Sequence, residues 1–275
     1  MFEYEFFRNA LFGILIISIA SAVIGTYIFA RRMVSIAGGI THACFGGLGL
    51  GYFLGFNPII MAGAFAVGSS LGVDWLSTRH RVREDSAIAV IWSFGMAIGV
   101  LFVFLTPGYV PELNSFLFGN ILTITRADLW AFGIFTVILL LFIALYFKQI
   151  IICAFDNDFA RVAGLKTSLI KAAMTAFTAI CIVLTIRLVG VMLLMSMFSL
   201  PQMIAETRFN RVKPLMISSA IISAACCLAG LGLACYINVP CSALIVIVMA
   251  IAFALARILS FLIARSHSLS NEQTQ

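Results

Sequence analysis

Long uncharged stretches separated by short polar ones dominate the pattern along the chain. Asn9–Ala30, Met33–Val73 and Pro214–Ala256 contain no Asp, Glu, Lys or Arg. A helix that crosses a membrane needs about 20 apolar residues. The first stretch therefore predicts one span, and each of the other two predicts a pair. Turn-forming residues divide these pairs at Gly55–Pro58 and at Asn238–Pro240.

The middle of the chain predicts four more spans. One runs from Ser86 to about Leu105 and the next from Asp128 to Phe147. A closely spaced pair follows, Ala172–Ile186 and Leu188–Ala205, which is broken near Arg187–Gly190. The total is nine crossings.

Two smaller features modify this pattern. Ser115–Thr125 is apolar but too short to cross a membrane, so we expect a short or re-entrant helix there. Pro201 lies inside the last span of the middle region and should kink its helix, because proline removes a backbone hydrogen-bond donor.

Composition supports a membrane protein. The 275 residues are 63% hydrophobic and 10% charged, with a mean hydropathy of +1.13, whereas a soluble domain carries roughly 25% charged residues. We expect an all-α polytopic membrane protein with about 8–9 transmembrane helices. Residues 1–265 would form the transmembrane domain and residues 266–275 a polar cytoplasmic tail.

The basic residues predict an orientation. With the N-terminus outside and the C-terminus inside, the outside keeps only Arg8, Arg126 and Arg187, and the other 14 of the 17 Lys and Arg residues lie inside. This asymmetry is typical of cytoplasmic loops. It also explains the net charge of +6 without nucleic acid.

His42 is the one histidine deep inside an apolar segment, the stretch Arg31–Gly55. Two interpretations are open: a hydrogen bond across a helix interface, or a metal or proton site, because polar groups at membrane depth usually face a cavity. Small residues surround it in a helix, which predicts space around the ring and close helix packing. They are Gly38 and Gly46 on the face of His42, and Gly47, Gly51 and Gly55 on a neighbouring face.

The longest polar segment of the chain is Phe155–Lys171, and it contains the amphipathic motif Phe155–Leu169. Acidic Asp156 and Asp158 precede basic Arg161 and Lys166, the order that suits the dipole of a short helix, and Gly164 is a natural stop. So short a helix needs a partner surface to be stable in water. Two interpretations therefore stay open from these residues: a cytoplasmic docking helix and an ordinary solvated loop.

Several other functions are disfavoured. Acidic residues fall near span ends, which argues against a carrier coupled to protons or sodium. No GxxxxGK[ST] motif is present, so the chain has no ATPase motif of its own and is not expected to be an enzyme. The seven cysteines have no CxxC spacing. Three methionines, Met192, Met195 and Met197, are interpreted as packing residues and not as a copper(I) site.

Four segments in order resemble the bacterial zinc/manganese/iron permease family of ABC transporters. RRMVSIAGGITHA, EDSAIAVIWSFGMAIGV, FDNDFARVAGL and LVGVMLLMSMFSLPQMIA are similar to family motifs that typically read RRMALIGDALSHA, EDTAIGI, FDPELARALGL and VVGVLLVSALLIIPAATA. The resemblance extends from the first span to about Leu255.

The resemblance implies a permease subunit in the bacterial cytoplasmic membrane with no permanently bound cofactor. Its partners would be a second permease chain, identical or homologous, two ATPase subunits and an extracytoplasmic metal-binding protein. FDNDFARVAGL would be the region that couples to the ATPase. The coupling residues would be Phe155, Asp156, Ala160, Arg161, Gly164 and Leu165.

One position departs from the family pattern. The family motif places an aspartate four residues before the histidine, and both are thought to contact the metal in transit. Here the histidine is His42 and the aspartate position is Gly38. Loss of a hard oxygen ligand should tilt the site from manganese toward zinc or iron(II). Two alternatives stay open: a permease for an iron chelate such as a siderophore or haem, and an ATP-independent channel or scaffold.

Overall fold

The described residues of the computed structural model are 5–80, 82–107, 119, 121 and 124–272, and within them every regular element of more than one turn is an α-helix. The helices are α1 (Glu5–Ala30), α2 (Val34–Leu54), α3 (Pro58–Arg79), α4 (Glu84–Leu105), α6 (Arg126–Phe155), α7 (Asn157–Val162), α8 (Thr167–Met197), α9 (Leu200–Glu206), α10 (Val212–Ile237) and α11 (Cys241–Glu272).

Nine segments of the described chain are long and apolar enough to cross a membrane, as predicted. The predicted break in the middle pair is confirmed, because Gly190 interrupts α8 with a φ of 80° and a ψ of 170°. Only glycine adopts such a conformation at low cost. The chain therefore uses Thr167–Ile186 for one crossing and Leu188–Glu206, which includes α9, for the next.

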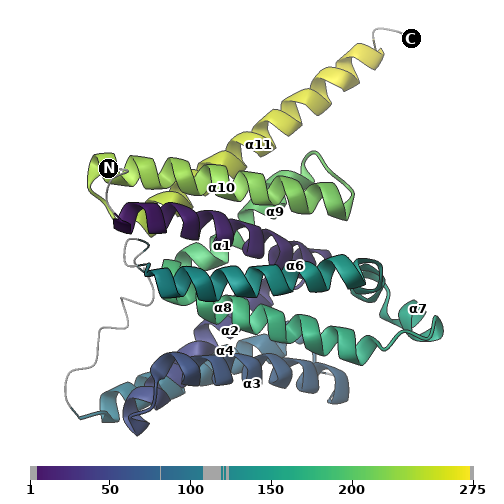
Figure 1. The fold of residues 1–275 in the computed structure, drawn as a ribbon. Coiled ribbons are helices and arrows are strands. Elements are labelled where there is room, and N and C mark those ends of the chain that lie inside the picture. The colour runs from purple at the N-terminus through teal and green to yellow at the C-terminus, as the bar shows by residue number, and fades with distance from the viewer. Residues whose placement is uncertain (1–4, 81, 108–118, 120, 122–123, 273–275) are drawn as a thin grey trace.

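The helices form layers, with α10 and α11 at one side, α1, α6 and α8 in the middle, and α2, α3 and α4 at the other side (Figure 1). The innermost segments are α2 and α1, in which 72% and 67% of the most apolar window is buried. By contrast, only 11% of that window is buried in α11. The glycine-rich helix that carries His42 therefore lies at the core of its layer.

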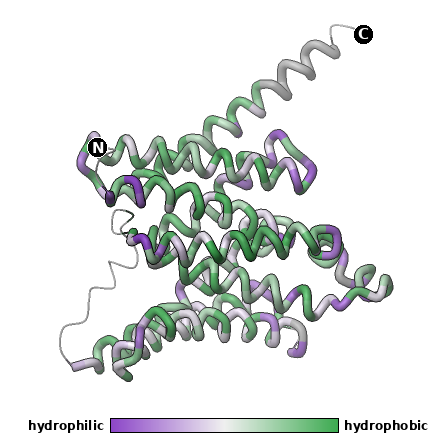
Figure 2. The backbone as a smooth tube through the Cα atoms, viewed as in Figure 1, coloured by the Kyte–Doolittle hydropathy of each residue, from purple (hydrophilic) through white to green (hydrophobic). Residues whose placement is uncertain are grey.

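Polar residues gather at the two ends of the bundle (Figure 2). At one end Arg31 lies 3.9 Å from Glu84, which joins the α1–α2 connection to the start of α4. At the other end Arg126 and Glu5 form an ion pair of 2.6 Å between the first turns of α6 and α1. Such a distribution is expected of a bundle whose middle lies in hydrocarbon.

Local signals explain several helix ends. Asn57 caps α3 by accepting hydrogen bonds from the backbone N–H groups of Ile59 and Ile60, and Thr125 and Asp128 form a capping box at the start of α6. Asn238 ends α10 in the left-handed conformation at the predicted turn.

Three expectations need comment. Pro201 does not kink a continuous helix; it stands in the first turn of α9, after the chain has left helical geometry at Ser199. Proline is tolerated there because the N–H it lacks would have no partner within the helix. The expected tail is helical in its first part, since α11 continues to Glu272. The segment predicted over Ser115–Thr125 lies mostly outside the described residues.

Candidate metal path and coupling segment

His42 lies in the middle of α2 and is partly exposed. Its imidazole stacks on the indole of Trp92 in α4, with ring centroids 4.5 Å apart and planes 4° from parallel. Within the described part of the chain, its Nδ1 is buried and has no hydrogen-bond partner. The ring is therefore held in place by stacking while one nitrogen lone pair or N–H is left unmatched, which is costly inside a membrane.

The glycines around His42 do not create open space, and that expectation was wrong. A Cβ on Gly38 would lie 2.6 Å from the methyl carbon of Met195 and 3.3 Å from its sulfur. A Cβ on Gly46 would lie 2.7 Å from the ring of Phe65 and 3.0 Å from the backbone oxygen of Gly95. Neighbouring helices fill these positions because glycine lets them approach closely.

The remaining glycines of the stretch have two different roles. Gly47 and Gly51 pack against the start of α3, at Met61 and Pro58 respectively. Gly55 is a correction to the expected packing face: it is exposed, nothing lies within 4 Å of its Cβ position, and its φ of 69° ends α2.

The sequence analysis missed Trp92, Gly95 and Gly99, which hold α4 against α2. A Cβ on Gly95 would lie 2.5 Å from the Cα of Ala43, and one on Gly99 would lie 2.5 Å from the backbone oxygen of Phe45. The Gly95-xxx-Gly99 spacing is the signal that could have found this interface. Nothing in the sequence marks Trp92, because its contact with His42 depends on how α2 and α4 pack against each other.

Among the described residues, no three His, Cys, Asp or Glu side chains are grouped so that they could hold a metal ion. The three methionines do not converge either, since Met197 is buried, Met192 is exposed and Met195 packs on Gly38. All seven cysteines are free thiols.

Several acidic side chains form ion pairs or hydrogen bonds at the helix ends. Asp74 near the end of α3 pairs with Lys171 near the start of α8. Asp85 accepts a hydrogen bond of 3.2 Å from Ser35. Glu206 lies 3.9 Å from Arg257. These contacts join helices at one end of the bundle and place no described carboxylate beside His42.

The short helix predicted in this segment is present as α7, and its two ends are capped. Asp156 accepts a hydrogen bond of 2.8 Å from the backbone N–H of Phe159. At the other end Gly164 has a φ of 75°, its N–H donates to Arg161, and the N–H of Leu165 donates to Ala160. This pair of bonds is the Schellman arrangement, which glycine stabilises by adopting the left-handed conformation.

Apolar side chains are exposed around α7, which projects from the end of the bundle (Figure 1). Phe155, Phe159 and Val162 are 65%, 58% and 89% exposed, while Ala160 is fully buried and anchors the helix. An exposed apolar group on a short polar helix is typical of a surface that binds another protein.

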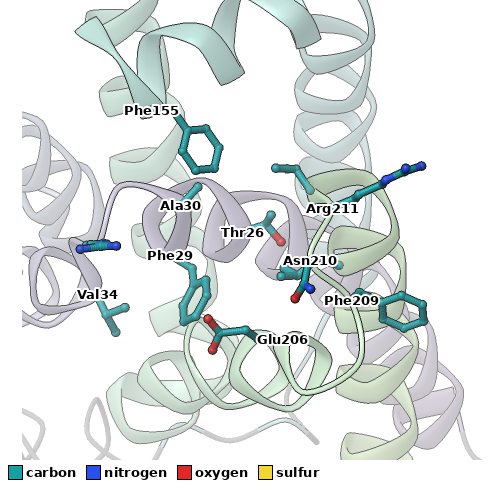
Figure 3. A pocket seen from close by; sticks show the side chains of 12 residues that line it. Thr26, Phe29, Ala30, Val34, Phe155, Glu206, Phe209, Asn210 and Arg211 are labelled. Carbon is teal, nitrogen blue, oxygen red and sulfur yellow. The ribbon is translucent and has the colours of Figure 1, made fainter.

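A pocket of about 510 Å³ adjoins this segment between α1 and the connection from α9 to α10 (Figure 3). Phe29, Phe155 and Phe209 give it apolar walls, and Glu206 faces its interior near Phe29. Arg211 also lines it. Neither His42 nor Trp92 lines this pocket, so the pocket is separate from their stack.

The chain matches known proteins over nearly its whole length. It is 34% identical over 242 residues to a protein of Chlamydia pneumoniae named a probable metal transport system membrane protein, covering 86% of this chain and 83% of that one. It is 26% identical over 256 residues to the manganese transport system membrane protein MntC of Listeria monocytogenes, covering 93% and 91%.

A solved structure is also similar. PsaBC from Streptococcus pneumoniae in complex with Fab superimposes with a TM-score of 0.81 at 25% identity, covering 92% of this chain and 91% of that chain. The family model for the ABC 3 transport family matches residues 3–260. This protein is therefore a multi-pass membrane subunit that belongs to the ABC 3 transport family.

Proposed function

We propose that the protein is the permease of an ABC importer that moves divalent transition-metal ions, zinc, manganese or iron, into the cytoplasm. A separate ATPase drives transport. The relatives described above are named for metal and manganese transport, which favours a metal ion over an iron chelate or an ATP-independent channel.

The main observation that supports coupling to an ATPase is the exposed apolar surface of α7. Phe159 and Val162 are the exposed apolar residues of a helix of only six residues. A helix of this length is not stable in water by itself, so its two caps and a bound partner must hold it. An ATPase subunit seated on α7 would transmit its movement through α6 and α8, the long helices joined to either end of the segment.

The orientation of the chain in the membrane follows from placing α7 in the cytoplasm. If α7 faces the cytoplasm, so do Arg31, Arg32, Lys171 and Arg211, and the N-terminus lies outside. The proposed partners are two ATPase subunits, a second permease chain that is identical or homologous, and an extracytoplasmic metal-binding protein. We propose no permanently bound cofactor.

His42 is proposed to line the path and to contact the metal briefly. A single imidazole binds a metal weakly, which suits a permease that must also release its substrate. The test is uptake of radiolabelled Zn²⁺ and Mn²⁺ in cells that depend on this transporter, with His42→Ala and His42→Gln at equal expression. We expect both variants to lose most of the uptake. Unchanged uptake in both would mean that His42 only packs against Trp92.

The docking surface is tested separately on the purified complex. Gly164→Ala forces an alanine into the left-handed region, which costs roughly 1–2 kcal/mol locally, and Arg161→Ala removes a charge of α7. The double variant should stay in the membrane while transport is uncoupled from ATP hydrolysis. Gly133→Ala on α6 is the control, because nothing lies within 4 Å of its Cβ position. Normal substrate-stimulated ATPase activity in the double variant would rule out docking on α7.

A further inference from the structure

We propose that Met195 supplies a thioether ligand next to His42, so that the passing metal meets one nitrogen and one sulfur and Zn²⁺ is favoured over Mn²⁺. This inference rests on the proposed function, since it assumes that a metal ion passes His42. It adds the substrate class and a residue that determines selectivity.

The first argument is the position of the sulfur. Gly38 and His42 are four residues apart on one face of α2, where Cβ atoms lie about 5–6 Å from each other. The sulfur of Met195 lies 3.3 Å from the Cβ position of Gly38. The thioether from α8 therefore occupies the place that a side chain on Gly38 would fill, one helical turn from the imidazole.

The second argument is the exposure of the two side chains. Leu193 and Leu194, the preceding residues of α8, are buried at 1% and 0% exposure. Met195 and His42 are instead both only partly buried. Both side chains can therefore be reached from outside the helix core, although Nδ1 of His42 is buried without a hydrogen-bond partner in the described structure.

The third argument is the chemistry of the donors. Thioether and imidazole ligands suit zinc and copper, whereas manganese prefers carboxylate, carbonyl and water oxygens. Six described carboxylates are held in ion pairs, hydrogen bonds or caps at the helix ends: Asp74, Glu84, Asp85, Asp128, Asp156 and Glu206. At the level of His42, the sulfur replaces the hard oxygen that a manganese ion would require.

The experiment measures initial uptake of Zn²⁺ and of Mn²⁺ by the complete transporter in cells, at equal surface expression. Met195→Leu removes the sulfur with almost no change in volume, a substitution that cores tolerate well. Met192→Leu is the matched control, because that methionine lies on the same helix and is exposed. Gly38→Asp introduces a carboxylate at this position, and its Cβ meets only the flexible end of Met195.

We expect the wild type to prefer Zn²⁺, Met195→Leu to lose several-fold in Zn²⁺ uptake with little change for Mn²⁺, and Met192→Leu to match the wild type. Gly38→Asp should shift the ratio toward Mn²⁺. If the wild type prefers Mn²⁺, or if Met195→Leu leaves the ratio unchanged, the thioether is only a packing group, and the proposed metal transport still stands. If the wild type takes up neither Zn²⁺ nor Mn²⁺, this inference fails, and the proposed function fails as well if uptake of Fe²⁺ is also absent.

Discussion

Replacing Gly95 by alanine should separate α4 from α2 and disturb the stack on His42. The added methyl group would lie 2.5 Å from the Cα of Ala43 and 3.0 Å from its Cβ and its backbone oxygen. Ordinary contacts begin near 3.4 Å. The atoms that obstruct the methyl group belong mainly to the backbone of α2, so no change of rotamer can relieve the clash.

The expected cost follows from this geometry. Forcing an extra methyl group into a packed interface costs typically 1–3 kcal/mol, and we expect about 2 kcal/mol because the whole helix must retreat. Trp92 lies one turn before Gly95 in α4 and would move with it, which would weaken the 4.5 Å stack on His42. Both stability and metal uptake should therefore fall.

The assay is thermal unfolding of the purified protein in detergent, with zinc uptake in cells as the second readout. Gly133→Ala is the matched control: it is the same substitution in a helix with open space around the glycine. Gly99→Ala should resemble Gly95→Ala, and the double variant should cost less than the sum, because one separation of the helices accommodates both methyl groups. The reasoning would be refuted if Gly95→Ala unfolded at the same temperature as Gly133→Ala.

Two ion pairs should differ in strength. Lys171 and Asp74 are partly buried, with side chains 21% and 37% exposed; a double-mutant cycle with Lys171→Met and Asp74→Asn should give a coupling of roughly 1–3 kcal/mol in thermal or denaturant unfolding. A coupling near zero would show that the pair does not join α3 to α8. Arg126 and Glu5 are 72% and 56% exposed, so Glu5→Gln should change stability by less than about 1 kcal/mol and its effect should vanish in high salt. A larger loss that persists in high salt would contradict this.

Much of the fold could be predicted from the sequence because the membrane restricts which backbone structures can form. Backbone groups in hydrocarbon must bond within a helix, so uncharged stretches such as Pro214–Ala256 translate directly into spans. Local residue types also predict where helices break and end. Gly190 permits the break in α8, and Asp156 and Gly164 cap α7. Each of these features depends only on residues near in the chain.

Features that depend on which helices meet could not be predicted in the same way. The glycines of α2 indicated that other helices approach closely. They did not indicate that Met195 would pack on Gly38 or that Phe65 would pack on Gly46. The stack of His42 on Trp92 joins residues 50 positions apart. Hydrophobic periodicity is weak when nearly every residue is apolar, so the partner of each helix face is decided by the shapes of side chains packing in three dimensions.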